Sequence, residues 1–87
     1  MSGYEKWLYA FLDVKDGKAT ACPRCTSKRV DIVIVRHPDS DVGWGIVWCD
    51  ECRKGARISR MGVTDDDKYV SDDEMLQIVP EDVELIF

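Results

Sequence analysis

Two short stretches, Cys22-Pro23-Arg24-Cys25 and Cys49-Asp50-Glu51-Cys52, decide how this 87-residue chain folds. Each stretch places two thiols on one tight turn, and 23 residues separate the two pairs. A two-residue spacer lets both sulfurs of a turn point at one ion, so two such turns supply a tetrahedral shell of four sulfurs. The pattern therefore predicts one structural metal ion, Zn²⁺, with Cys22, Cys25, Cys49 and Cys52 as its ligands.

Other uses of four cysteines remain as alternatives. Iron is chemically allowed in the same shell, because ligand geometry alone does not separate it from zinc. Two disulfides would suit an oxidising compartment, whereas residues 1–6 show no secretory signal and favour the cytoplasm, where thiols stay reduced. A redox pair needs a thioredoxin-like βαβ pattern, which is absent. The longest apolar runs, Trp7–Leu12 and Ile32–Val35, are far shorter than the roughly 18 residues of a membrane span.

The residues around the cysteines predict a hairpin with a third strand. β-Branched and aromatic residues alternate over residues 29–36 and 42–48, which is typical of strands, and a third strand is expected over residues 56–63. The cysteines then lie at the base of the hairpin. Upstream, apolar residues recur at helical spacing from Tyr4 to Leu12 and predict a short helix. The alternative there is a strand that turns at Asp16-Gly17.

The cysteine turns and the alternating strands together resemble a zinc ribbon, over roughly residues 20–61. The resemblance implies a metal-stapled, three-stranded antiparallel sheet. With the predicted N-terminal helix, which lies outside the resemblance, the expected fold is small and α+β or mainly β. It implies no single function, because zinc ribbons serve transcription, translation and protein docking. One departure is visible: many ribbon turns have glycine after the second cysteine, where Thr26 and Arg53 stand here.

Charge divides the chain, whose net charge is −5. Residues 15–60 are net positive, whereas the residues after them are strongly acidic. The run Asp65–Asp67 is typical of a solvated linker, since like charges repel. We therefore expect a zinc-ribbon domain over residues 1–63, helix included, and an acidic C-terminal extension over residues 64–87.

The C-terminal extension has sequence features that predict structure of its own. Ser71 and Glu74 have the spacing of a capping box, which predicts a short helix. Pro80 would stop that helix. The apolar residues 83–87 offer a way for the extension to dock back onto the domain.

Basic residues flank both cysteine turns and form a candidate surface for a partner or for nucleic acid. Its members are Arg24, Lys28, Arg53, Lys54, Arg57 and Arg60. The alternative is a solvated surface, because the whole chain is acidic. In the first interpretation, the acidic residues 65–84 would cover this surface in the free protein as an internal competitor.

Trp44, Ile46 and Trp48 share one face of the second strand. An aromatic platform for bases or a partner peptide is one interpretation. The other, which we favour, is that this face packs against the apolar stripe of the N-terminal helix, because a small domain is short of core.

The hairpin tip at residues 37–41 offers a further hypothesis. Asp39 and Asp41 resemble the acidic tip residues of transcript-cleavage elongation factors, in which a zinc-ribbon tip helps to hold a catalytic metal in RNA polymerase. The adjacent Asp-Glu pair of those factors is missing here, since Ser40 separates the two aspartates, and turns are rich in aspartate for local reasons. His37 is expected to be a surface residue of the turn.

No Ser/His/Asp or Cys/His set is available, so we expect no catalysis by the chain alone. The favoured function is a zinc-binding adaptor or regulatory module that docks on a protein or nucleoprotein partner, in transcription or translation, as a monomer or weak dimer. Direct binding of nucleic acid is one form of this function, and no membrane is involved. The alternatives are an accessory factor for transcript cleavage and a purely structural or metal-handling protein.

Overall fold

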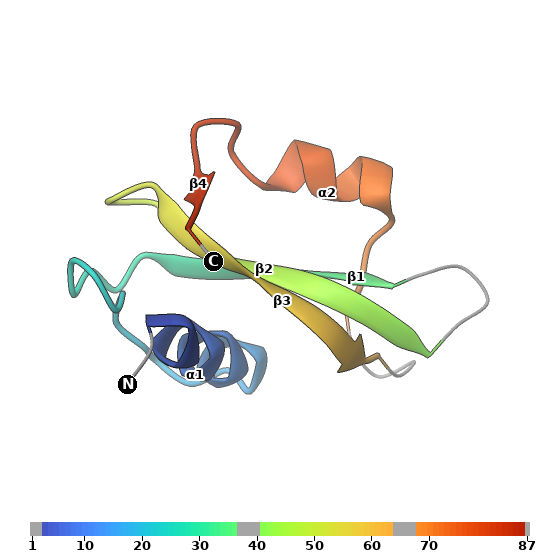
Figure 1. Cartoon of the computed structure of the whole chain (residues 1–87), viewed down its shortest axis with the longest axis horizontal. Helices are drawn as coiled ribbons and strands as arrows, with labels where there is room; N and C mark the ends of the chain where they lie inside the picture. The colour runs from blue at the N-terminus through green and yellow to red at the C-terminus, as the bar shows by residue number, and fades with distance from the viewer. Residues whose placement is uncertain (1–2, 37–40, 64–67, 87) are drawn as a thin grey trace.

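The computed structural model describes residues 3–36, 41–63 and 68–86, and Arg60 by its backbone alone. The elements are α1 (Gly3–Lys15), β1 (Val30–Arg36), β2 (Val42–Cys49), β3 (Lys54–Gly62), α2 (Asp72–Ile78) and β4 (Glu84–Leu85). They form one sheet in the order β1-β2-β3-β4, with α1 on one side and α2 on the other (Figure 1). The small α+β fold predicted from the sequence is confirmed.

α1 is the predicted N-terminal helix, longer by one turn at its C-terminal end. It buries Trp7, Ala10 and Phe11 against the sheet. The helix stops at Gly17, whose φ of 77° is the left-handed conformation that glycine adopts freely. The N–H of Lys18 donates to the carbonyl of Asp13 at 2.8 Å, which completes a Schellman-type end. Asp16-Gly17 therefore ends a helix, and the alternative of a strand there is wrong.

The sheet begins as the predicted antiparallel hairpin. β1 pairs with β2 from Val30 opposite Cys49 to Arg36 opposite Gly43. β3 returns antiparallel to β2 and starts at Lys54, directly after the second cysteine turn. A register shift between Gly43 and Gly45 marks a bulge near the far end of this pair. Both ends of the cysteine-flanked segment are thereby brought to the same end of the sheet.

The two faces of β2 are covered differently from what the sequence predicted. Ile46 and Trp48 form a cluster with Val33, and C-terminal residues pack on it. The N-terminal helix instead covers the opposite face, where a Cβ at Gly45 would lie 2.6 Å from the Phe11 ring. The expectation that the Trp44 face packs on α1 is therefore wrong. Glycine at the facing positions lets α1 approach more closely than a Trp face would allow.

The described part of the extension packs on the Trp48 face. Val70 makes a parallel bridge to Val35 of β1. The predicted capping box is confirmed, since the hydroxyl of Ser71 accepts the backbone N–H of Glu74 at 3.3 Å, and the helix ends before Pro80. The predicted linker Asp65–Asp67 lies outside the described residues.

The last described residues add a short strand. β4 runs parallel to β3 and pairs Lys54 with Glu84 and Gly55 with Leu85. The sequence alone predicted three strands, and this fourth one is only two residues long. It brings the acidic C-terminal residues to the end of the sheet that carries the cysteines.

Candidate metal centre

The two cysteine turns have matching backbones. The N–H of Thr26 donates to the carbonyl of Cys22, and the N–H of Arg53 donates to the carbonyl of Cys49, each at 3.0 Å. Within each turn a further backbone N–H points at the first sulfur, from Arg24 to Cys22 Sγ and from Glu51 to Cys49 Sγ, both at 3.4 Å. Hydrogen bonds of this kind favour a thiolate and orient it.

The four sulfurs converge on one point. All four Sγ atoms lie within 4.8 Å of one another. The Cys22–Cys52 pair is 3.7 Å apart and the Cys25–Cys49 pair 3.5 Å apart. A tetrahedron with metal–sulfur bonds of about 2.3 Å has edges of about 3.8 Å, whereas a disulfide bond is about 2.05 Å long. The cysteines are therefore positioned to bind one metal ion, and no disulfide joins them.

The pKa values of the cysteine thiols indicate that thiolates at this site require a nearby cation. Burial raises the pKa of Cys22 to about 12, and burial also raises the pKa of Cys52. The pKa of Cys25 is lowered, chiefly by a hydrogen bond from the backbone of Ser27. Buried thiolates are costly without a nearby positive charge, and a divalent metal ion supplies that charge by displacing the protons.

The residues after each cysteine pair adopt the conformation that glycine would favour. Thr26 has a φ of 63° and Arg53 a φ of 57°. A non-glycine residue in this left-handed region costs roughly 1–2 kcal/mol. Thr26 and Arg53 therefore hold a left-handed backbone without the freedom of glycine, which adds local strain to both turns.

The predicted basic residues separate into two groups. Arg53 and Lys54 lie at the metal end, where the guanidinium of Arg53 is 3.4 Å from Asp82 and Lys54 Nζ is 2.7 Å from Glu84. Arg57 lies on the tryptophan face, with its guanidinium 4.6 Å from the ring centre of Trp44.

The remaining predicted members belong to the first turn or are only partly described. Arg24 and Lys28 are exposed beside the first pair of cysteines. The side chain of Arg60 lies outside what the structure describes. We name the group at the metal end, Arg24, Lys28, Arg53 and Lys54, the knuckle surface.

Two acidic partners of the knuckle surface, Asp82 and Glu84, come from the C-terminal extension, and a third, Asp50 of the second cysteine turn, lies 3.7 Å from Arg53. The N–H of Glu84 donates to the carbonyl of Arg53 at 3.0 Å, which sets the carboxylate beside Lys54. A hydrogen bond from Lys54 holds the pKa of Glu84 below its usual value, and the charge of Arg24 lowers it further. Charge asymmetry in the sequence pointed to the extension, but only the strand pairing identifies Asp82 and Glu84 as the residues in contact.

The hairpin tip is described only at its margin. Asp41 lies 3.1 Å from the guanidinium of Arg36. The predicted tip residues His37 and Asp39 lie outside the described residues.

The chain matches no protein-family model, no curated protein and no solved structure. In the described part of the chain, neither helix has the length and hydropathy of a membrane span. The function is therefore inferred from the site and its surroundings.

Proposed function

We propose that this chain is a zinc-binding adaptor that docks on a protein or nucleoprotein partner through the knuckle surface. Zinc is the metal that the donor set favours, since four thiolates in a closed tetrahedron are typical of structural zinc sites. Such a shell leaves no open position, so the proposal gives the metal no catalytic role. Its task is to hold the two turns together and so to position the cations beside them.

One observation carries the docking proposal: cations from both turns gather at the metal end and are met there by carboxylates of the same chain. The contacts Lys54–Glu84 and Arg53–Asp82 are exposed ion pairs. Pairs of this kind contribute little to stability, so a partner that carries several negative charges can replace them at low cost. The knuckle surface is thus suited to phosphates or to an acidic protein segment.

The extension is held mainly by apolar contacts. Val70, Met75, Val79 and Val83 pack against the cluster around Trp48. Removing residues 64–87 would expose that cluster and would test folding more than docking. Neutralising the acidic residues is the sharper experiment, because it leaves the apolar contacts in place.

The test compares the zinc-loaded protein with the double variant Asp82→Asn/Glu84→Gln. Binding is measured by fluorescence anisotropy to two labelled probes, a 20-nucleotide single-stranded RNA and a polyglutamate peptide, across a range of salt concentrations. We expect the double variant to bind at least one probe about 5–30-fold more tightly, because two competing charges are removed. The affinity should fall as salt rises.

A matched control variant changes the net charge by the same amount, but at residues away from the knuckle surface. Asp72→Asn/Asp73→Asn lies in the first turn of α2 and should leave the affinity near that of the unmodified chain. The proposal is contradicted if neither probe binds at low salt, or if both double variants gain equally. The preferred probe tells a nucleoprotein partner from an acidic protein partner.

The pH dependence follows from Glu84. Because Lys54 depresses the pKa of Glu84, the ion pair is complete near neutral pH and is lost as pH falls through that lowered pKa. Acidification should therefore release the extension's carboxylate from the knuckle surface.

The alternative functions have weaker support. An accessory role in transcript cleavage rests on Asp39 and Asp41, of which only Asp41 is among the described residues, and the sequence lacks the adjacent Asp-Glu pair of such factors. A metal-handling protein would have to release its metal to a competing chelator within minutes. A closed four-thiolate site that is half-buried in the core is expected to release it far more slowly.

A further inference from the structure

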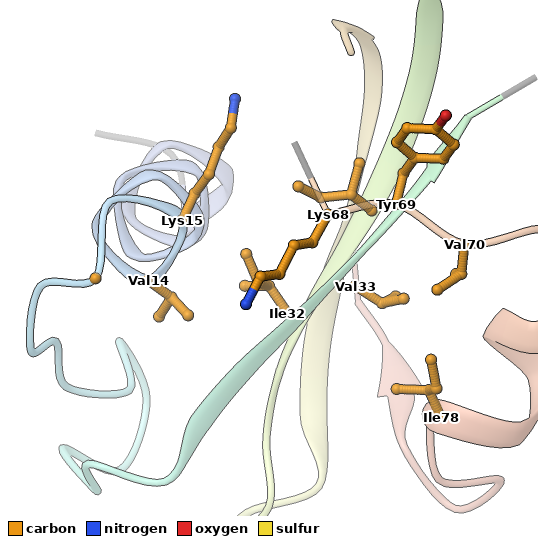
Figure 2. Close-up of a pocket in the computed structure, with 10 residues that line it drawn as sticks. Val14, Lys15, Ile32, Val33, Lys68, Tyr69, Val70 and Ile78 are labelled. Carbon is orange, nitrogen blue, oxygen red and sulfur yellow. The ribbon is translucent and has the colours of Figure 1, made fainter. Parts of the chain in front are cut away.

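A groove runs along β1, on the side of this strand that faces away from β2. Its volume is about 520 Å³, and its lining comes from the end of α1, from β1, from the segment that leads into α2 and from Ile78 at the end of α2. Figure 2 shows Val14 on one side of the β1 ribbon and Ile78 on the other, with Lys68 reaching across toward Ile32. The groove therefore follows a strand edge and is open to both faces of the sheet.

The backbone of β1 is ready to accept another strand. The carbonyl of Ile34 accepts the N–H of Val70 at 2.9 Å, and the N–H of Arg36 donates to the carbonyl of Val70 at 3.4 Å. Strand alternation then directs the N–H and C=O groups of Ile32 to the same outer edge. Among the described residues, no strand pairs with this edge between Val30 and Val33. Val70 thus pairs with the far end of an edge whose first half is open.

The side chain of Asp31 occupies the position that a backbone carbonyl of an added strand would take. The N–H of Ile32 donates to Asp31 Oδ1 at 2.8 Å. Asp31 is exposed and can rotate away, so this contact satisfies the edge donor without blocking it. Charged side chains are a common protection of open strand edges, and Asp31 is one on this edge.

The lining suits an extended chain with alternating side chains. Val14 and Ile32 are on the α1 side, whereas Val33, Val70 and Ile78 are on the α2 side. In an added strand, successive side chains point to opposite faces of the sheet. Alternate apolar residues would therefore enter the two halves of the groove.

The charged residues that line the groove indicate which kind of ligand it would bind. Among the described residues that line the groove, the charged ones are Lys15 and Lys68, and none carries a carboxylate. The described lining is therefore basic, in a chain whose net charge is −5. A carboxylate in the ligand would lie favourably beside the ammonium group of Lys68.

From these observations we propose that the groove binds an extended, acidic and partly apolar peptide of a partner protein as an added strand on β1. Main-chain hydrogen bonds to Ile32 would supply affinity. The apolar side chains on the two sides of the groove, together with Lys68, would supply specificity, as in other cases of strand addition. The proposal uses no residue of the knuckle surface, so it stands or fails independently of the proposed docking of anions there.

The experiment selects ligands from a phage library of random octapeptides on the zinc-loaded full chain. Enriched peptides should alternate apolar residues and carry at least one carboxylate. Calorimetry with a synthetic copy of the most enriched peptide should then show about a 10-fold or greater loss of affinity for Ile78→Asp and about a 3–10-fold loss for Lys68→Glu. Amide hydrogen exchange of Ile32 should slow when the peptide binds.

Two matched variants control for general effects. Leu76→Asp changes a large apolar residue that is 67% exposed, on the same helix as Ile78 but outside the groove lining. Lys6→Glu reverses an exposed lysine of α1 that also lies outside the lining. Both should bind the peptide within about 2-fold of the unmodified chain, since neither touches the ligand.

Three results would overturn the proposal. The first is that no sequence is enriched above a parallel selection on Ile78→Asp. The second is that the enriched peptide binds equally well to Lys68→Glu, or leaves the exchange of Ile32 unchanged. The third is that sedimentation shows a dimer that Ile78→Asp converts to a monomer, because the edge would then be covered by a second copy of the chain.

Discussion

The two faces of the sheet are covered to different depths. On the α1 face, Trp7 and Phe11 are 1% and 0% exposed, and they pack with Val47 in the largest cluster of the described residues. On the opposite face, the strands bury Ile46 and Trp48 equally well, but no residue of α2 is buried. On the first face, α1 buries several of its own side chains in the core. The other has a thin cover of half-buried residues.

The metal site belongs to the better-sealed face. Cys22 and Cys49 are members of the same cluster as Phe11. Apolar burial contributes about 25 cal/mol per Å², and more buried residues belong to the α1-face cluster than to the opposite one, so we expect the α1 face to contribute the larger share of the stability. The difference teaches that this chain has one core, built by α1, the sheet and the cysteines that are positioned to bind a metal ion, and a second layer that packs on its other face.

Removing the metal should have the largest effect. A chelator is expected to abolish most of the fold, since structural zinc contributes on the order of 10–16 kcal/mol in small domains. Far-UV circular dichroism and the melting temperature measure this loss, with the same chelator preloaded with zinc as the control. The loss should also grow as pH falls, because the thiols must lose protons to bind metal and burial raises the pKa of Cys22 to about 12.

This experiment also tests how the two faces are linked. Since the thiolates lie in the α1-face cluster, both layers should melt together when the metal leaves. An unchanged melting temperature would show that the core does not depend on the metal. It would remove the reason for treating the α1 face as the centre of the fold.

Truncating one residue on each face should have an intermediate effect. Phe11→Ala removes a fully buried ring and should lower the free energy of unfolding by about 3–5 kcal/mol. Met75→Ala removes a half-buried side chain from the opposite layer and should cost about 1 kcal/mol. Urea denaturation of the zinc-loaded proteins measures both values, with the exposed Leu12→Ala and Leu76→Ala as controls on the same helices. Equal losses for Phe11→Ala and Met75→Ala would contradict the difference between the faces.

Relieving strain in the first cysteine turn should have the smallest effect. Thr26 holds a φ of 63°, so Thr26→Gly should raise the free energy of unfolding by about 0.5 kcal/mol, after the entropy that glycine gains in the unfolded chain is subtracted. Lys28→Gly, at a position without a positive φ, should lower the stability by a similar amount. If both glycine variants are destabilised equally, the left-handed turn stores no strain.

Local patterns were sufficient to predict several elements. The capping box of Ser71 and Glu74 and the stop at Pro80 depend on contacts within a few residues, and the structure has them. The alternation over residues 42–48 likewise predicts β2, because side-chain alternation is a property of any strand.

Local patterns could not predict which helix packs on which face of the sheet. Both faces of β2 carry apolar or small residues, so the pattern does not say which layer meets which face. Gly45 lies on the face opposite Trp44, and its lack of a side chain admits the ring of Phe11 in the fold. The larger side chains of Trp44 and Trp48 were therefore assigned to the wrong helix.

The sequence by itself determined the four cysteines that meet, the hairpin between them and the short helices, because spacing, alternation and capping act over short distances along the chain. The tertiary structure alone decided which helix covers which face, where the acidic residues contact the knuckle surface, and that no strand of the described residues pairs with the first half of the β1 edge. These outcomes depend on how the volumes of distant residues fit together. Packing of that kind leaves no periodic signal in a single sequence.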